Sequence, residues 1–264
     1  MQQVEDFAQE CAVLDDLLQS LSAADWTRAT QFKSWTVNDV MVHLHYWNRM
    51  AHWSWVDEAR FDTELQAMMQ GIAQGSMRAV ENLAIAERGS ALRDAWRAHL
   101  DVMLPLWRDI DPKARLKWAG PSMSARSSIT ARQMETWAHS QALFDLMGVT
   151  REESDRIQNI VVLGVNTFGW TFQARQQTPP GPMPQLLLTS PSGAAWTYGE
   201  AQEDNRISGT AIDFARVVTQ TRHVQDTALQ VSGAVAQTWM DHAQCFAGPA
   251  NEPPAPGTRY RQST

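Results

Sequence analysis

Three side chains of this 264-residue sequence have the types and spacing of a metal site. Glu135 and His139 are four residues apart in "ARQMETWAHSQALFDLMG", so both project from one face of a helix predicted over about 130–147. The rest of that face is small or apolar and therefore turns toward the interior, where an unpaired carboxylate is costly. A divalent cation would satisfy Glu135 and His139 together with a third inward ligand.

His43, in "WTVNDVMVHLHYWNRMAHW", is the candidate for that third ligand. It lies inside the apolar stripe of a second predicted helix, whereas His45 and His52 lie on the opposite face. We expect His45 and His52 to be solvated and His43 to point inward. Inward histidines are more often core residues that a single hydrogen bond satisfies, so His43 alone does not decide between core packing and ligation.

The combination of two imidazoles and one carboxylate is a familiar ligand set for Zn²⁺, with Ni²⁺, Fe²⁺ or Mn²⁺ as alternatives. Structural zinc sites usually have four protein ligands, so three leave a position for a thiol, a water or a substrate. A buried Glu135–His139 ion pair without metal is the competing interpretation. Cys11 and Cys245 are too few for a zinc cluster or a disulfide framework.

The helices that would position these residues are predicted from apolar spacing of three and four residues. They cover about 4–21, a segment opened by a capping box at Thr36 and Asp39, a segment from about Ser90, and 130–147 with Gly148 as its cap. We expect Pro105 to kink the third of these or end it early. A further helical stretch covers roughly 64–87. Four long amphipathic helices predict an antiparallel bundle.

The sequence changes character after Gly148. One helix is predicted over roughly 153–175, followed by the hinge-like "QQTPPGPMPQ" and the β-like runs "QLLLTS", "AAWTYG" and "NRISGT". "AIDFARVVTQ" is helical, "TALQVSG" suits a strand and "AVAQTWMDHAQCF" suits a last helix. The predicted fold class is therefore mainly α with a smaller α+β part. The predicted domains are 1–150, 151–248 and a proline-rich flexible tail, 249–264.

Composition narrows the partners. The net charge of −7 argues against a nucleic-acid or anionic-membrane surface. No run of about 18 apolar residues predicts a membrane span, and the acidic start "MQQVEDFAQE" does not resemble a signal peptide. We therefore expect a cytoplasmic protein that acts on a small-molecule substrate. The sequence is compatible with a homodimer but contains no feature that measures one.

These motifs resemble a known family. "LSAADW" and "WTVNDVMVHLHYW" are similar to the N-terminal signature of DinB-like bundles, and more closely to the mycothiol-dependent maleylpyruvate isomerase family. The resemblance implies that His43 is a metal ligand and that Glu135 and His139 in "METWAH" match the family's E-x-x-x-H motif. "ISGTAIDFARVVTQTRHVQDTAL" resembles the family's sterol-carrier-like α+β module.

The resemblance also implies a reaction, in which a divalent metal makes a low-molecular-weight thiol available as thiolate for attack on a small carboxylate-bearing substrate. Family members use a C-terminal arginine near the site, and Arg222 in "TQTRH" is the best match. Its planar guanidinium suits a carboxylate, although a surface arginine near a helix end is the other interpretation. His223 is a weaker candidate for a proton carrier.

Other functions stay open at this point. The same metal could activate water, which would make the protein a hydrolase without a thiol cofactor. Alternatively, the protein is a non-catalytic module that binds a metal or an apolar ligand. A nuclease is the least favoured reading of the DinB likeness, because the chain is acidic and has no basic stripe.

Overall fold

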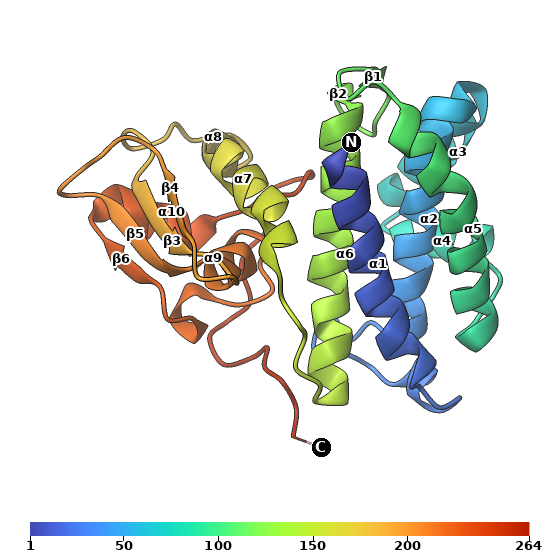
Figure 1. Cartoon of the computed structure of the whole chain (residues 1–264). Coiled ribbons are helices and arrows are strands. Elements are labelled where there is room, and N and C mark those ends of the chain that lie inside the picture. The colour runs from blue at the N-terminus through green and yellow to red at the C-terminus, as the bar shows by residue number, and fades with distance from the viewer. Residues whose placement is uncertain (264) are drawn as a thin grey trace. The chain divides into compact units, whose positions relative to one another are not determined.

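A computed structural model describes residues 1–263 and divides the chain into two compact units, Met1–Leu146 and Met147–Thr264 (Figure 1). The first is helical, and the second combines helices with a four-stranded sheet. The predicted fold class, mainly α with a smaller α+β part, is confirmed. No helix within residues 1–263 is both long enough and apolar enough to cross a bilayer.

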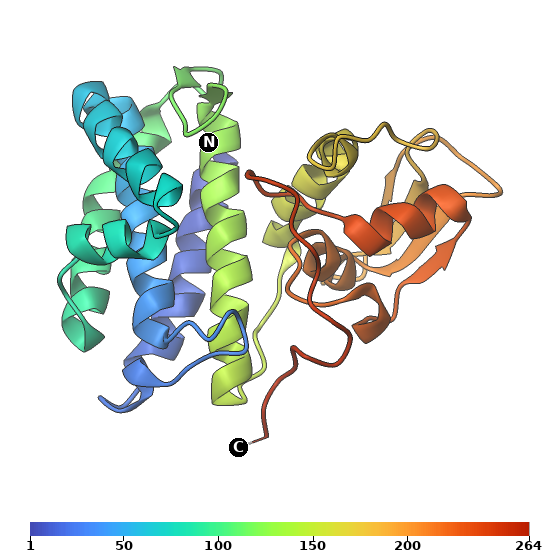
Figure 2. The ribbon, with the colours of Figure 1, turned by 180° about the vertical axis from the view of Figure 1, so that it is seen from behind.

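Four long helices run side by side in the first unit (Figures 1 and 2). They are α1 (Gln2–Gln19), α2 (Val37–Val56), α5 (Gly89–Asp109) and α6 (Ala125–Met147). Two shorter helices, α3 (Glu58–Ala73) and α4 (Met77–Ala84), come between α2 and α5 in the chain. The remaining elements are the 3-10 turn η1 (Asp25–Thr27) and a small hairpin of β1 (Arg115–Leu116) and β2 (Met123–Ser124).

Helix α2 is the best covered helix of the bundle. It begins with the predicted capping box, in which the side chains of Thr36 and Asp39 each bond the other residue's backbone N–H. Fourteen of its 20 residues are buried, because α3, α4 and α5 all pack against it. The expectation that His45 and His52 are solvated is therefore wrong: they are 5% and 7% exposed. The prediction assumed a solvent face that this helix lacks.

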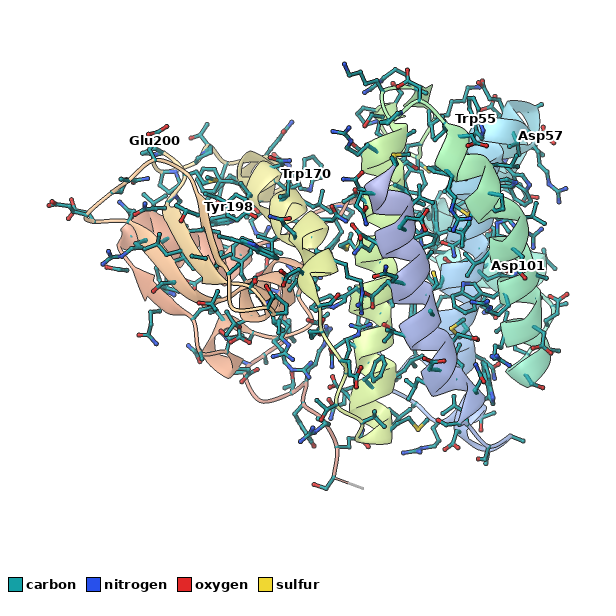
Figure 3. All side chains as sticks on the ribbon, viewed as in Figure 1. Trp55, Asp57, Asp101, Trp170, Tyr198 and Glu200 are labelled. Carbon is teal, nitrogen blue, oxygen red and sulfur yellow. The ribbon has the colours of Figure 1, made fainter. Side chains whose placement is uncertain are left out.

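One helix boundary also differs from expectation, and of the two outcomes expected at Pro105 the early end does not occur. The stretch 64–87 forms two helices rather than one, since the chain turns at Gly75 with a left-handed φ of 77°. Pro105 does not end α5, which continues to Asp109. Asp101, whose carbonyl a residue at position 105 would normally bond, is exposed, so water can replace the lost hydrogen bond. Figure 3 shows Asp101 on α5, with Trp55 and Asp57 where α2 gives way to α3.

The second unit contains a sheet in the order β4-β3-β5-β6, where β3 and β5 are parallel and the other pairs antiparallel. Its strands are β3 (Gln185–Thr189), β4 (Ala195–Tyr198), β5 (Arg206–Thr210) and β6 (Gln230–Ser232). Its helices are α7 (Gln158–Asn166), α8 (Phe168–Gln173), α9 (Ala211–Val218) and α10 (Ala234–His242), with 3-10 turns η2 (Asp155–Ile157) and η3 (Val224–Asp226). Each predicted strand and the two late helices are present.

The helix predicted over 153–175 is interrupted at Thr167, so that α7 and α8 replace it. The hydroxyl of Thr167 donates to the carbonyls of Leu163 and Gly164, which helps close α7. Gly164 itself allows a close approach of α9: a Cβ there would lie 2.9–3.0 Å from the side chains of Val218 and Phe214. The packing of α7 on α9 therefore requires this glycine.

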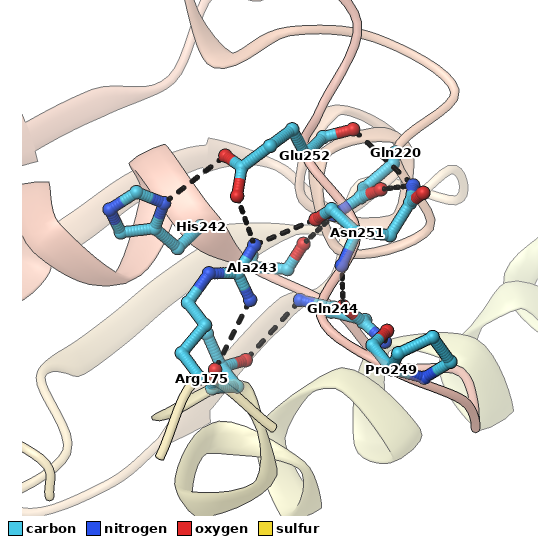
Figure 4. Close-up of polar contacts among 9 residues, drawn as sticks. Arg175, Gln220, His242, Ala243, Gln244, Pro249, Asn251 and Glu252 are labelled. Atoms are coloured by element: carbon cyan, nitrogen blue, oxygen red, sulfur yellow. Dashed lines mark hydrogen bonds and ion pairs between the residues drawn. The ribbon is translucent and has the colours of Figure 1, made fainter. Parts of the chain in front are cut away.

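Residues 249–263 contain no helix or strand, yet they make polar contacts within the second unit (Figure 4). The Asn251 amide donates to Gln220 at 2.5 Å, and its backbone N–H donates to Gln244 at 2.9 Å. Arg175 donates to the Asn251 carbonyl at 2.7 Å. The segment predicted to be a mobile tail is thus bonded at Asn251 to side chains that are buried, because Gln220 and Gln244 are 3% and 1% exposed.

Candidate metal centre

Helices α2 and α6 bring His43, Glu135 and His139 together, and we call these three residues the ligand triad. Each offers one ligand atom, and the three atoms all lie within 4.8 Å of one another. Nε2 of His43 is 3.5 Å from Oε2 of Glu135, and Nε2 of His139 is 3.0 Å from the same oxygen. The side chain of His43 is 9% exposed, while those of His139 and Glu135 are 14% and 23% exposed. Solvent therefore reaches the triad from its α6 side.

Behind His43 lies Glu81 of α4, a residue that the sequence reasoning missed. Its Oε1 accepts from Nδ1 of His43 at 2.8 Å and from the indole N–H of Trp47 at 2.9 Å, and its side chain is 1% exposed. With a proton on Nδ1, the Nε2 lone pair of neutral His43 faces the triad. Such an outer carboxylate fixes the tautomer and raises the basicity of a metal-binding histidine.

The loop before α2 supplies an aromatic wall. The Trp35 ring stacks on the His139 ring, with centroids 5.7 Å apart and planes 5° from parallel, and meets the His43 ring edge-on at 5.3 Å. Phe32 meets the His139 ring edge-on at 5.0 Å. Lys33 and Ser34 have positive φ values of 51° and 55°, so the chain turns tightly between the two aromatic residues. The wall limits how the imidazoles can rotate.

The carboxylates shift the pKa values of this cluster in opposing ways. Burial lowers the pKa of His43, but its hydrogen bonds to Glu135 and Glu81 outweigh burial and raise it to about 9. Burial raises the pKa of Glu135, but the hydrogen bonds from His139 and His43 hold it well below its usual range. For His139, burial dominates the bond to Glu135 and lowers its pKa. Without metal, a protonated His43 is the cation that the two carboxylates share.

The donor set fits a divalent metal. Zinc bonds of about 2.1 Å in a tetrahedron separate neighbouring ligand atoms by about 3.4 Å. The distances of 3.5 and 3.0 Å from the Glu135 oxygen are close to this spacing. The convergence expected from the spacing of His43, Glu135 and His139 is present in the fold, while their role as metal ligands stays a prediction.

A buried cation adjoins the triad. Arg132, one helical turn before Glu135 on α6, is 2% exposed, and its Nε donates to the Asn48 side chain at 3.0 Å. Burial lowers the pKa of Arg132, and the negative charges of Glu135 and Glu81 counteract this. The formal charges of Arg132, Glu81 and Glu135 sum to −1. A divalent cation would leave this set at +1, which an anionic ligand would neutralise.

Helix α2 also carries a second group of imidazoles, His45 and His52, which face His99 of α5; we call these three the distal histidine cluster. Ring centroids are 5.6 Å apart for His45–His99 and 5.3 Å for His52–His99. Among the described residues, no hydrogen-bond partner is present for Nδ1 of His45, Nδ1 of His52 or Nε2 of His99. Burial lowers the pKa of His45 to about 3 and that of His99 to about 4.

The two residues predicted in the C-terminal half, Arg222 and His223, lie between α9 and η3 in the second unit. Arg222 Nη1 donates to the Thr221 carbonyl at 2.9 Å. His223 is the N-cap of η3, where its Nδ1 accepts from the Gln225 N–H at 3.1 Å. This bond gives His223 a structural role. The catalytic role of Arg222 stays a prediction.

Comparison with known proteins adds to this geometry. The family model described as the mycothiol maleylpyruvate isomerase N-terminal domain matches residues 7–144, which span the whole triad. The chain belongs to this family. The match contains α2 and α5 in full and most of α1 and α6, and it places the triad residues of α2 and α6 within the isomerase-type domain.

The sequence of this maleylpyruvate isomerase family member is similar to those of two relatives, and the similarity extends over both units. They are the uncharacterized proteins Rv0036c and MT0041 of Mycobacterium tuberculosis, strains ATCC 25618 / H37Rv and CDC 1551 / Oshkosh. Each is 35% identical over 246 residues, covering 93% of this chain and 95% of its own.

Solved structures share the fold of both units. The crystal structure of the mycothiol-dependent maleylpyruvate isomerase aligns with a TM-score of 0.52 at 15% identity, covering 82% of this chain and 87% of that one. A mutant of that enzyme aligns with the same score at 13% identity. The helical domain followed by an α+β domain is therefore an arrangement that this family member has in common with the isomerase.

Proposed function

We propose that this protein is a metal-dependent enzyme of the maleylpyruvate isomerase type. In this proposal His43, Glu135 and His139 hold a divalent metal, with Zn²⁺ favoured by the donor set. When bound, the metal supplies positive charge that lowers the pKa of a low-molecular-weight thiol and so makes thiolate available near neutral pH. The observation that carries the proposal is the convergence of the three ligand atoms, with Glu81 bonded behind His43.

The chain's own residues prepare the site for this chemistry. Glu81 holds the proton on Nδ1 of His43, so that Nε2 is the atom presented to the metal. Trp35 and Phe32 keep water from one side of the imidazoles and fix their orientation. The buried charge of Arg132 makes the occupied site positive overall, which favours a thiolate over neutral water as the remaining ligand.

The isomerisation itself balances without a consumed reagent. A thiolate sulfur bonds to an alkene carbon conjugated with a carbonyl group, and the alkene electron pair moves to the carbonyl oxygen. The former carbon–carbon double bond is then a single bond, so the substrate can rotate about it. Return of the electron pair expels the thiolate and leaves the trans alkene, so the thiol is regenerated. The solved structure with a similar fold is that of the mycothiol-dependent maleylpyruvate isomerase. We propose that this protein uses the same class of thiol and the same class of small carboxylate-bearing substrate.

Spectroscopy on cobalt-loaded protein tests the proposal. We expect wild-type protein to bind about one Co²⁺ in each chain, to change its visible spectrum when mycothiol is added, and to isomerise maleylpyruvate only when the thiol is present. The His139→Ala variant should lose the bound metal and both thiol-dependent signals. A metal-loaded protein that ignores thiol and hydrolyses simple esters would instead establish the hydrolase alternative. Wild-type protein that binds no metal would refute the metal-dependent reading altogether.

A further inference from the structure

A pocket of about 450 Å³ lies beside the triad in the first unit. It is lined by Trp35, Gly75, Ser76, Met77, Arg78 and Asn82. Trp35 is shared with the metal centre, because the same ring contacts both imidazoles of the triad. The volume falls within the range of small-molecule sites. A ligand in this pocket would therefore lie one aromatic ring away from the triad.

Helix α4 joins the pocket to the metal centre. Glu81 faces His43 from this helix, whereas Arg78 and Asn82, four residues apart, line the pocket from another face of it. The same eight-residue helix thus carries the outer carboxylate of the metal centre and the polar lining of the pocket.

Arg78 is held in a defined position and still has donors to offer. Its Nη2 pairs with Asp39, its guanidinium carbon lies 5.4 Å from the centroid of the Trp35 ring, and its side chain remains 43% exposed. A guanidinium has five N–H donors in a planar fork, so the pair with Asp39 leaves others for a carboxylate. The ion pair and the ring contact reduce the freedom that binding would remove.

The charges around Arg78 favour an anion. Arg88 donates to the Asn82 side-chain oxygen at 2.5 Å, and Lys33 lies over the Phe32 ring at 5.3 Å. Three cationic side chains, those of Arg78, Arg88 and Lys33, thus gather around the pocket and the aromatic wall, against the carboxylates of Asp39 and Glu81. This local balance is positive in a chain whose net charge is −7. Coulomb attraction therefore draws carboxylates to this place on an otherwise acidic protein.

We propose that this pocket binds the carboxylate of a small dicarboxylate-type substrate, with Arg78 as its charged anchor. The inference rests on the proposed function for the choice of substrate class, and it assigns the recognition of that group to the first unit. Asn82 lines the same pocket with an amide N–H₂, of which one hydrogen bonds the Arg78 carbonyl at 2.8 Å. The second hydrogen is a neutral donor beside the guanidinium.

Calorimetric titration with maleate, a dicarboxylate that lacks the reacting ketone, tests this site on the full chain. We expect Arg78→Met to weaken maleate binding at least tenfold in zinc-treated and in metal-free protein, and Arg78→Lys to weaken it less. The matched control is Arg60→Met, which removes a cation that also pairs with a carboxylate and lies over a tryptophan ring but does not line the pocket, and it should change affinity less than threefold. Dimethyl maleate, the uncharged ester, should bind equally to wild type and Arg78→Met.

The outcomes separate this proposal from the proposed function. If Arg78 controls maleate binding in a protein that binds no metal, the pocket assignment holds and the metal-dependent mechanism fails. If wild-type protein does not bind maleate, or if Arg78→Met binds it as wild type does while its circular dichroism and thermal unfolding are unchanged, the pocket assignment is wrong. In that case thiol-dependent activity of the same preparation would still support the metal mechanism.

Discussion

Helix α2 contributes histidines to two groups that lie in opposite electrostatic settings. In the ligand triad, His43 bonds two carboxylates, and its pKa rises to about 9 despite burial. In the distal histidine cluster, burial lowers the pKa values of His45 and His99 to about 3 and 4, and the one opposing contact, a backbone hydrogen bond of Asn48 with His99, does not offset it. Both groups are buried and both lie between packed helices. Burial of an imidazole therefore does not by itself create a cation site.

What separates the two groups is the supply of carboxylates. Glu135 and Glu81 place negative charge on two sides of His43, and a buried negative set requires a cation for neutrality. The distal histidine cluster contains no such charge and is neutral when its imidazoles are unprotonated. We therefore expect metal to bind at the ligand triad and not at the distal histidine cluster. We expect acid to destabilise the fold by protonating the distal histidine cluster.

Removing a triad ligand should give the largest effect. We predict that His139→Ala, or His43→Ala, weakens zinc binding more than 100-fold, because two protein ligands rarely hold zinc tightly. The matched variant is His52→Ala in the distal histidine cluster, which should retain wild-type affinity. Competition with a chromophoric chelator measures all three. Equal zinc losses in His139→Ala and His52→Ala would break the contrast between the two groups.

Removing the outer carboxylate should give the next largest effect. We predict that Glu81→Gln weakens zinc binding 10- to 100-fold, since the amide keeps the shape but no longer strengthens His43 as a ligand. Nitrogen-15 NMR of metal-free protein should also show a lower pKa for His43 than in wild type, with only the increase from Glu135 remaining. Glu87→Gln makes the same charge change at an exposed position and should leave both unchanged. A normal zinc affinity in Glu81→Gln would mean that the bond to His43 is structural only.

The sequence was informative where local periodicity decides the outcome. The capping box at Thr36, the i, i+4 pair Glu135 and His139, and the strands of the second unit all depend on nearby residues, and all are present. The opposite holds for contacts set by packing. His45 and His52 are buried because three other helices cover α2, which no pattern within α2 reveals.

Glu81 is the instructive omission in the site. It lies in a stripe with Met77, Val80 and Ala84, so a charged residue at an apolar position of α4 was the available signal. The signal was weak because α4 has eight residues and merged with α3 in a single predicted stretch. Its partner, His43, is 38 residues away in the chain, and only the fold brings the two together.

Acid should expose the distal histidine cluster. The pKa of His99 is about 4 in the folded protein and near 6.5 when unfolded, so the unfolded chain binds the proton more tightly. The stability from neutral His99 is complete above pH 6.5 and is lost as the pH falls through 4. We predict that His99→Leu reduces the drop in unfolding free energy between pH 7 and 4.5 by about 2 kcal/mol.

Urea unfolding followed by circular dichroism at both pH values measures this difference. Leu100→Met, at the next position of α5, changes a buried side chain without changing an ionisable group, so it provides the control and should retain the wild-type pH dependence. If His99→Leu loses as much stability on acidification as wild type, His99 is not the group whose protonation opposes the fold, and the neutral character of the distal histidine cluster would have to be abandoned.

The smallest effect is expected from Trp47→Phe, which tests how much the hydrogen bond from Trp47 to Glu81 contributes. The substitution keeps an aromatic ring but removes the indole N–H that donates to Glu81 at 2.9 Å, while the bond from His43 remains. We predict a loss of about 1 kcal/mol of unfolding free energy, and a two- to fivefold change in zinc affinity, because one of two donors to a buried carboxylate is lost.

Trp107→Phe is the matched control: its buried indole N–H has no partner among the described residues, so the same substitution removes no bond. Equal effects of the two substitutions would show that ring packing, rather than the bond to Glu81, accounts for the loss, and that His43 alone holds this carboxylate in place.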